Sequence, residues 1–313
     1  MHIAVVGAGG VGGYFAGLLA KAGHRIDLLA RGPHLEAIRR RGGIEIREPA
    51  AKGGETSFIA AVAATDDATT MRGASHAILA VKSYSLSELA PVLRAIASGG
   101  TAIVPLLNGV DIGDRLVELG VARSALLGGL TYVNTARTAP GVVTRTSSFC
   151  RATVGEPDGP VSDRVRQLVA ALRESGVETE ATDAIALELW RKFALLAPLA
   201  AVCGLAHRPL GAVRAVPNGR AVLERALREV VRVAQAMGVP LTEDDARGTL
   251  RRLDALPDTT RPSFLADVER GGPAELDVLS GAVVRLARRL GVETPLHETA
   301  AVAIGAQTSP ATQ

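Results

Sequence analysis

The first 120 residues alternate short, continuously apolar runs with longer stretches in which apolar positions recur at helical spacing. Such runs predict strands buried on both faces, at residues 3–6, 25–30, 77–81 and 102–107. Helical spacing follows three of these runs, at residues 14–23, 86–93 and 112–119. Parallel strands joined by helices predict a doubly wound sheet of the α/β class.

The pattern changes between residues 121 and 154, which are rich in Thr, Gly and Val and carry a turn signal at Pro140-Gly141. This texture predicts shorter, antiparallel strands. A helix is predicted at residues 161–175, and a last short strand at residues 177–181.

From Asp183 onward the pattern is nearly all helical. Apolar spacing near 3.6 predicts long helices at residues 185–202, 221–237, 242–253 and 276–290. We therefore place a domain boundary near Thr182. The prediction is an N-terminal Rossmann-type dinucleotide-binding domain over residues 1–182, followed by an all-helical substrate and catalytic domain over residues 183–313.

Charge and composition exclude several classes of function. The 35 basic and 32 acidic residues leave a net charge of +3, too small for a nucleic-acid-binding surface. No apolar run reaches the roughly 18 residues that cross a membrane, so neither nucleic acid nor membrane is expected as a partner. Two cysteines supply no disulfide framework, and the chain opens directly into a strand. The expected compartment is the cytoplasm.

The first strand runs into a glycine motif of the form G-x-G-x-x-G. Gly7 permits the tight turn, Gly9 lets the backbone approach a pyrophosphate, and Gly12 lets the helix pack close to the strand. The pyrophosphate then lies at a helix N-terminus, where free N–H groups favour an anion. The predicted dinucleotide-binding residues are Gly7, Ala8, Gly9, Gly10, Val11 and Gly12. The alternative is a glycine turn with a structural role alone.

The end of the second strand indicates which dinucleotide binds. An NAD site usually has Asp or Glu there, but Asp27 comes too early and lies within the strand. The expected position holds Arg31, whose guanidinium can bind a 2′-phosphate through two hydrogen bonds. We therefore predict NADPH as the cofactor. The alternative is that Arg31 is a solvated surface arginine.

Further motifs are spread along the chain. They are Ala22-Gly23-His24, Val81-Lys82, Leu107-Asn108-Gly109, Trp190-Arg191-Lys192-Phe193, Pro262-Ser263-Phe264-Leu265, Ala274-Glu275-Leu276-Asp277 and Gly291-Val292. With them the sequence resembles the ketopantoate reductases, also called 2-dehydropantoate 2-reductases, over nearly its whole length. The glycine motif is widespread, whereas the W-x-K helix combined with the P-S-x-x-x-D and E-x-D segments is specific to this family.

The resemblance implies roles for five residues. Lys192, Glu275 and Asn108 match the catalytic residues, and Ser263 matches a serine that, with Lys192 and Glu275, binds the substrate. Lys82 and Asn108 match residues on the cofactor side. No metal is implied. The family uses NADPH to reduce a branched 2-keto acid, ketopantoate, to the 2-hydroxy acid pantoate, a precursor of pantothenate.

These residue types suit the reaction. As hydride reaches the keto carbon, the carbonyl oxygen becomes alkoxide-like, and a lysine ammonium can stabilise it and deliver a proton. A carboxylate such as Glu275 can position that lysine or a substrate hydroxyl. The Asn108 amide can bond to the lysine, the substrate or the nicotinamide ribose.

Each of these residues also has a purely structural alternative. Lys192 is four residues after Glu188 and would form an ordinary surface ion pair on one helix. Asn108 would form a simple turn, and Glu275 would be a first-turn helix charge. Ser263, after a proline, would cap a helix.

The sequence departs from the family one and two helical turns after the lysine. The family commonly has asparagines at the positions of Leu196 and Ala200. A site that bonds a substrate hydroxyl has here lost polar partners and gained an apolar wall, so a more apolar 2-keto acid is an alternative substrate.

Two other functional classes stay open. One is another Rossmann-plus-helical dehydrogenase of the hydroxyacyl, opine or polyol-phosphate kind. The other is a non-catalytic NADP-sensing protein, against which the presence of Lys192, Glu275 and Asn108 argues. A helical domain rich in Ala and Leu favours a homodimer.

Overall fold

A computed structural model describes residues 1–50, 53–269 and 274–308. The chain forms two compact units. Unit 1 contains Met1–Leu107 and Ile112–Ile185, and unit 2 contains Asn108–Asp111 and Ala186–Gln313. The sequence placed the boundary near Thr182, and its periodicity gave no sign that the segment 108–111 groups with the helical unit.

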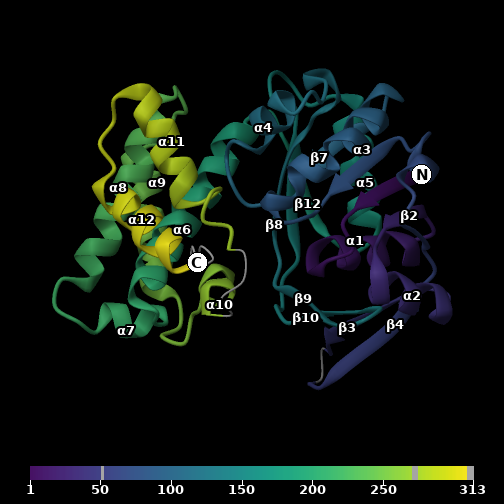
Figure 1. Cartoon of the computed structure of the whole chain (residues 1–313), viewed down its shortest axis with the longest axis horizontal. Helices are drawn as coiled ribbons and strands as arrows, with labels where there is room; N and C mark the ends of the chain where they lie inside the picture. The colour runs from purple at the N-terminus through teal and green to yellow at the C-terminus, as the bar shows by residue number, and fades with distance from the viewer. Residues whose placement is uncertain (51–52, 270–273, 309–313) are drawn as a thin grey trace, which may run out of the picture. The chain divides into compact units, whose positions relative to one another are not determined.

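Unit 1 contains a parallel sheet with the strand order β5-β2-β1-β6-β7. Figure 1 labels β2 and β7 of this sheet. Its strands are β1 (His2–Val6), β2 (Arg25–Leu29), β5 (Ala63–Thr65), β6 (His76–Leu79) and β7 (Ala102–Pro105). The predicted doubly wound sheet is confirmed, although β5 was too short to be recognised. Residues 3–6 of the central β1 are fully buried, as their continuous apolar run requires.

Two smaller sheets in unit 1 have the orders β4-β3-β10-β9 and β12-β11-β8. Their strands are β3 (Ile44–Pro49), β4 (Glu55–Ala60), β8 (Gly128–Tyr132), β9 (Thr135–Ala139), β10 (Val142–Arg145), β11 (Arg151–Gly155) and β12 (Glu178–Thr182). Antiparallel pairing is found for β9 with β10 and for β8 with β11. In contrast, β10 pairs in parallel with β3, and β12 in parallel with β11. The β3–β4 hairpin was not predicted, although Ile44 and Ile46 of β3 are buried and alternate with the charged Glu45 and Arg47, a pattern typical of a half-buried strand.

Helices connect the strands of unit 1. They are α1 (Gly10–Lys21), α2 (Gly32–Arg41), α3 (Leu86–Ser98), α4 (Ile112–Glu118) and α5 (Asp163–Glu174), with the 3₁₀ helices η1 (Ala68–Met71), η2 (Ser83–Ser85) and η3 (Arg123–Ala125). Phe15 and Leu19 of α1 are fully buried in the core. On another face of α1, a Cβ at Gly17 would lie 2.4 Å from the Ile46 side chain of β3. The small residues of α1 therefore let it pack against two sheets.

The described part of unit 2 after residue 185 is helical. Its helices are α6 (Ile185–Ala206), α7 (Leu210–Arg214), α8 (Gly219–Ala236), α9 (Glu243–Ala255), α10 (Ser263–Glu269), α11 (Ser280–Leu290) and α12 (Pro295–Thr308). Helices α7 and α10 are too short for a periodic pattern, and the Ala- and Gly-containing α12 has no clear apolar stripe. Helix α11 begins at Ser280 instead of Leu276, because residues 275–279 form turns.

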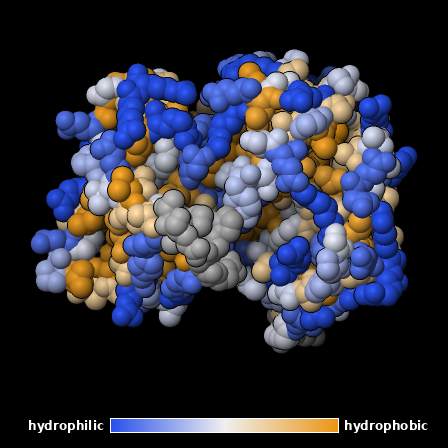
Figure 2. Space-filling view, in the orientation of Figure 1, coloured by the Kyte–Doolittle hydropathy of each residue, from blue (hydrophilic) through white to orange (hydrophobic). Residues whose placement is uncertain are grey.

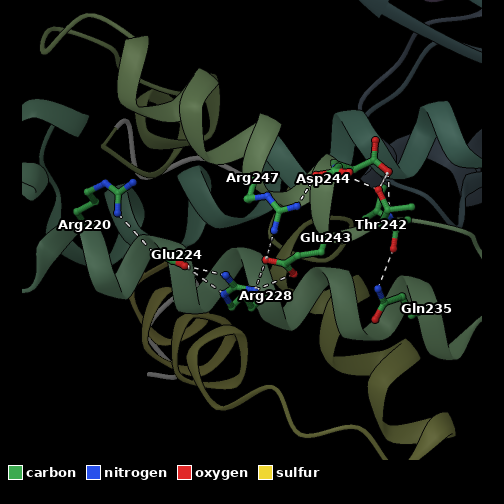
Figure 3. A network of polar contacts seen from close by, with 10 residues as sticks. Arg220, Glu224, Arg228, Gln235, Thr242, Glu243, Asp244 and Arg247 are labelled. Carbon is green, nitrogen blue, oxygen red and sulfur yellow. Dashed lines mark hydrogen bonds and ion pairs between the residues drawn. The ribbon is translucent and has the colours of Figure 1, made fainter.

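Ion pairs between side chains join α8 to the start of α9 (Figure 3). The Arg228 guanidinium contacts Glu224 on its own helix and Glu243 on α9. Thr242 and Asp245 form a reciprocal capping box at the start of α9.

On the face shown in Figure 2, hydrophilic residues are spread over the surface with apolar residues between them. Many of the arginines thus have ordinary surface roles.

Among the described residues, α6 has the length and composition of a membrane-spanning helix. Its most apolar 18-residue window has a mean hydropathy of 1.5, and 67% of that window is buried inside the protein. The sequence prediction concerned continuous apolar runs, and this helix meets the criterion by average composition although Glu188, Arg191 and Lys192 interrupt its apolar residues. A core helix meets the same criterion when small and apolar residues line most of its circumference, as they do here.

Candidate functional site

The glycine motif forms a tight connection between β1 and α1. Gly7 has φ +109°, a conformation that side-chain-bearing residues rarely adopt. A Cβ at Gly12 would lie 1.9 Å from the Gly7 carbonyl oxygen, so the helix can approach the strand only with glycine there. Because β6 lies next to β1, its continuation at Ala80 and Val81 contacts the same turn.

A pocket of about 170 Å³ opens beside this turn. Its lining residues are Gly7, Ala8, Gly9, Leu29, Ala30, Arg31, His34, Val81, Leu89 and Arg137. Apart from Gly9 and its two chain neighbours, no described residue has an atom within 4 Å of the position that a Cβ on Gly9 would occupy, so the backbone is open to a ligand there. Helix α1 starts at Gly10 without a side-chain cap, which leaves the N–H groups of its first turn to bind an anion. Gly10, Val11 and Gly12 belong to this turn.

Arg31 lies at the rim of the pocket, at the N-cap of α2. Its side chain is 58% exposed and forms an ion pair with the exposed Glu88 at 2.5 Å. Exposed pairs of this kind contribute little to stability, so a phosphate can replace Glu88 at small cost. Asp27 lies within β2, where its buried carboxylate contacts His2 Nε2 at 2.6 Å. It is therefore committed to a structural contact.

Two residues that line the pocket were not predicted from the sequence, His34 and Arg137. His34 is buried on α2, and its Nδ1 accepts a hydrogen bond from the Gly141 N–H, which places the proton of the neutral ring on Nε2. This Nε2 lies near the Ala8 backbone without a well-formed hydrogen bond to any described residue. Burial lowers the pKa of His34, and the nearby Arg137 lowers it further.

Arg137 projects from β9, which follows the glycine motif by more than 120 residues. Among the residues that the structure describes, no carboxylate pairs with its guanidinium. No sequence motif marks Arg137. It reaches the pocket because β9 pairs with the other strands of its sheet, which local spacing does not reveal.

Lys82 is half-buried and follows β6 by three residues. It starts the 3₁₀ helix η2 as its N-cap residue. Its neighbour Val81 lines the pocket, so Lys82 belongs to the same end of the parallel sheet.

The second group of candidate residues surrounds Lys192, in unit 2. Lys192 is on α6, and the buried Trp190 and Phe193, whose rings meet edge to face, lie close to it in the sequence. Only 8% of Lys192 is exposed, and burial lowers its pKa to about 8, although the Glu275 carboxylate acts in the opposite direction. Its Nζ donates a hydrogen bond to Asn108 Oδ1 at 3.1 Å. The structure thus brings Lys192, Asn108 and Glu275 together.

The proposed surface ion pair of Lys192 with Glu188 is not what the structure shows. Glu188 accepts a hydrogen bond from Arg191 Nη1 at 2.6 Å, and Arg191 Nε also donates to Asp245 of α9 at 2.8 Å. Residues 188 and 191 are half-buried on α6, whereas Lys192 is buried. Arg191 and Lys192 are therefore adjacent in the sequence but differ in burial.

The remaining candidate residues differ in their surroundings. Glu275 is buried in the turn before α11, so the alternative that it is a first-turn helix charge is wrong. Ser263 is exposed at the first residue of α10, and its hydroxyl forms no hydrogen bond with a described residue. Leu196 is half-buried against the apolar core of unit 2, and Ala200 is fully inside that core. Among the described residues, no group of three or more His, Cys, Asp or Glu is arranged to hold a metal ion.

Comparison with known proteins gives one consistent family. A family model described as ketopantoate reductase PanE/ApbA matches residues 3–159, and its counterpart for the C-terminal part of the same family matches residues 184–307. The two matches cover most of both units.

Individual relatives agree with this assignment. A 2-dehydropantoate 2-reductase of Halobacterium salinarum is 32% identical over 302 residues, covering 96% of this chain and 97% of its own. An uncharacterized oxidoreductase of Bacillus subtilis, YkpB, is 29% identical and covers 96% of each chain. The crystal structure of a 2-dehydropantoate 2-reductase from Geobacter metallireducens is 25% identical, with a TM-score of 0.87 over 98% of this chain and 99% of that chain. The chain belongs to the ketopantoate reductase family, whose members are oxidoreductases that bind a nicotinamide dinucleotide.

Proposed function

We propose that this protein is an NADPH-dependent reductase that converts a 2-keto acid to the 2-hydroxy acid. The observation that carries the proposal is the buried Lys192, hydrogen-bonded to Asn108 and with a pKa lowered to about 8. A lysine in this state carries a proton at neutral pH and releases it more readily than a solvated lysine.

The roles of the three residues follow from their contacts. NADPH, when bound, supplies the hydride that reaches the keto carbon. The Lys192 ammonium stabilises the negative charge that develops on the carbonyl oxygen and donates a proton to it. Asn108 Oδ1 accepts one N–H of Lys192 and so directs the remaining ones. Glu275 favours the charged form of the lysine.

The residues that line the pocket in unit 1 support binding of a dinucleotide that carries a 2′-phosphate. The Gly7–Gly9 backbone is open, and the first turn of α1 offers N–H groups to the pyrophosphate. Arg31 and Arg137 supply two cations, and His34 Nε2–H is a buried donor near the Ala8 backbone. We assign the 2′-phosphate to Arg31 and Arg137, which favours NADPH over NADH. Lys82 lies beside this pocket on the cofactor side.

The substrate is proposed to be ketopantoate or a more apolar 2-keto acid. Leu196 lies one helical turn after Lys192 and presents an apolar side chain where the family commonly has asparagine. Ser263 and Glu275 are the proposed polar contacts of the substrate. A homodimer and a cytoplasmic location are part of the same proposal, and sedimentation of the purified protein measures the first.

The test is NADPH oxidation by the purified protein with a panel of carbonyl compounds. The panel contains ketopantoate, its analogue without the hydroxyl group, other branched 2-keto acids and 3-ketoacyl compounds. Turnover confined to 2-keto acids is expected. Turnover confined to other carbonyl compounds would support a different dehydrogenase, and tight NADPH binding without any turnover would support an NADP-sensing protein.

A further inference from the structure

The segment 108–111 belongs to unit 2, although the residues on either side of it belong to unit 1. Asn108, at its start, accepts the hydrogen bond from Lys192. Val110 packs against the apolar core of unit 2. Asp111, at its end, is buried, and its Oδ2 lies 2.5 Å from Arg285 Nη2. The segment is therefore attached to the helical unit through two polar contacts, one at each end.

Arg285 also contacts the turn before α11, which carries Glu275. It lies on α11, and its Nη1 donates to Asp277 Oδ1 at 2.9 Å. Asp277 follows Glu275 by two residues in the turn before α11. One guanidinium thus joins the segment that carries Asn108 to the turn that carries Glu275. Both of these residues act on Lys192.

The position of Asp111 depends on its ion pair with Arg285, because the Asp111 carboxylate is buried. Asp111 Oδ1 is buried without a hydrogen-bond partner among the described residues, so Arg285 is the group that offsets the charge of this carboxylate. A buried carboxylate that loses its cation is strongly destabilised where it lies. Removing Arg285 therefore favours displacement of the segment toward water, and Asn108 would move with it.

We propose that Arg285 and Asp111 are positioning residues that hold Asn108 and Glu275 in place around Lys192. This inference rests on the proposed function, in which Lys192 is the proton donor. Neither residue is assigned a contact with the reacting atoms. Each acts through the geometry of the lysine site, where a displacement of about 1 Å can cost roughly a hundredfold in rate.

The first experiment compares steady-state kinetics of Arg285→Met, Asp111→Asn and Arg285→Lys with those of the wild type. We expect kcat to fall roughly tenfold to a hundredfold in the first two variants, with the Kd for NADPH unchanged. Arg285→Lys keeps a cation and should recover part of the loss. The matched control is Arg288→Met on the same helix, because Arg288 is exposed and its contact with Glu298 is 3.9 Å long. It should behave as the wild type.

A second measurement does not depend on turnover. The chain has four lysines, so a sample labelled with ¹³C at lysine Cε gives a simple spectrum, in which Lys192→Met identifies the signal of Lys192. Titration then gives the pKa of Lys192 in each variant. Removing a cation and removing an anion should shift this pKa in opposite directions if they act only through long-range charge. If both release the same segment, the shifts have the same direction, which is the result we expect.

Unchanged kcat in both Arg285→Met and Asp111→Asn, or pKa shifts that are absent or opposite, would overturn the positioning role. Failure of the proposed function is a separate result: Lys192→Met would then retain turnover in the same assay. If Arg285→Met does not fold, as judged by thermal unfolding, Asp111→Asn and Arg285→Lys still decide the matter.

Discussion

The two candidate sites use cations in different ways. In unit 1 the dinucleotide pocket is formed by glycine backbone and is bordered by Arg31, whose side chain is 58% exposed. In unit 2 a single lysine, Lys192, is 8% exposed inside a helical core. A cation at the edge of water is placed at small cost and serves binding. A buried cation is costly to place, and its environment changes its chemistry.

The difference in residue type follows from this difference in location. An arginine side chain keeps its charge over the working range of pH and matches the geometry of a phosphate. A lysine changes its pKa readily when buried, and the pKa of Lys192 is lowered to about 8. Exchanging the two residue types would therefore harm both sites, the first in geometry and the second in proton transfer.

The largest expected effect comes from removing the buried cation. Lys192→Ala should reduce kcat roughly a hundredfold or more, because stabilisation of the developing charge and proton donation are lost together. The Kd for NADPH should hardly change. Steady-state rates and cofactor titration measure the two quantities.

The control for this prediction is Glu188→Ala. Glu188 forms a half-buried ion pair with Arg191 on the same helix, away from the lysine ammonium, so its loss should leave kcat near the wild-type value. Small and equal effects of Lys192→Ala and Glu188→Ala on kcat would contradict a catalytic role for Lys192.

The next effect concerns the exposed cations. Arg31→Ala should weaken NADPH binding by roughly 1.5–3 kcal/mol, the value of a charge-assisted hydrogen bond, and leave NADH binding nearly unchanged. Arg137→Ala should have the same selectivity if it shares the 2′-phosphate. Fluorescence titration with both cofactors measures this. Equal weakening of NADPH and NADH would show that the arginine does not contact the 2′-phosphate.

How much the sequence predicted also differs between the sites. Gly7 and Gly12 are required by local backbone geometry, so their spacing alone predicted the turn that the structure shows. Lys192 and Glu275 are far apart in the chain, and only the resemblance to a family singled them out. Arg137 was missed because its position depends on the pairing of β9, a long-range property. The attachment of Asp111 to Arg285 is long-range in the same way.

The buried lysine should also determine the pH dependence of the rate. In the proposed mechanism reduction requires the protonated lysine, so the rate should be constant at lower pH and fall as the pH rises through about 8, by about tenfold per pH unit above that value. Glu275 raises the pKa of Lys192, so Glu275→Gln should move this decline to lower pH. Profiles of kcat/KM against pH measure both. A decline that begins only near the ordinary lysine value of 10.5 would contradict the effect of burial.

The smallest expected effect is a change of substrate preference at Leu196. This residue is half-buried one turn after Lys192, so Leu196→Asn would place an amide beside the proposed substrate site without entering the innermost core. One new hydrogen bond to the hydroxyl of ketopantoate is worth about 0.5–1.5 kcal/mol, so the ratio of kcat/KM for ketopantoate to that for its analogue without the hydroxyl should rise about two- to tenfold. The matched contrast is Ala200→Asn, which enlarges a fully buried residue and should lower the thermal stability instead. A wild type that already strongly prefers ketopantoate over the analogue would contradict this interpretation, because the hydroxyl would then have a polar partner elsewhere in the site. In that case Leu196 would pack the helical core, and specificity would depend on other residues such as Ser263 or Glu275.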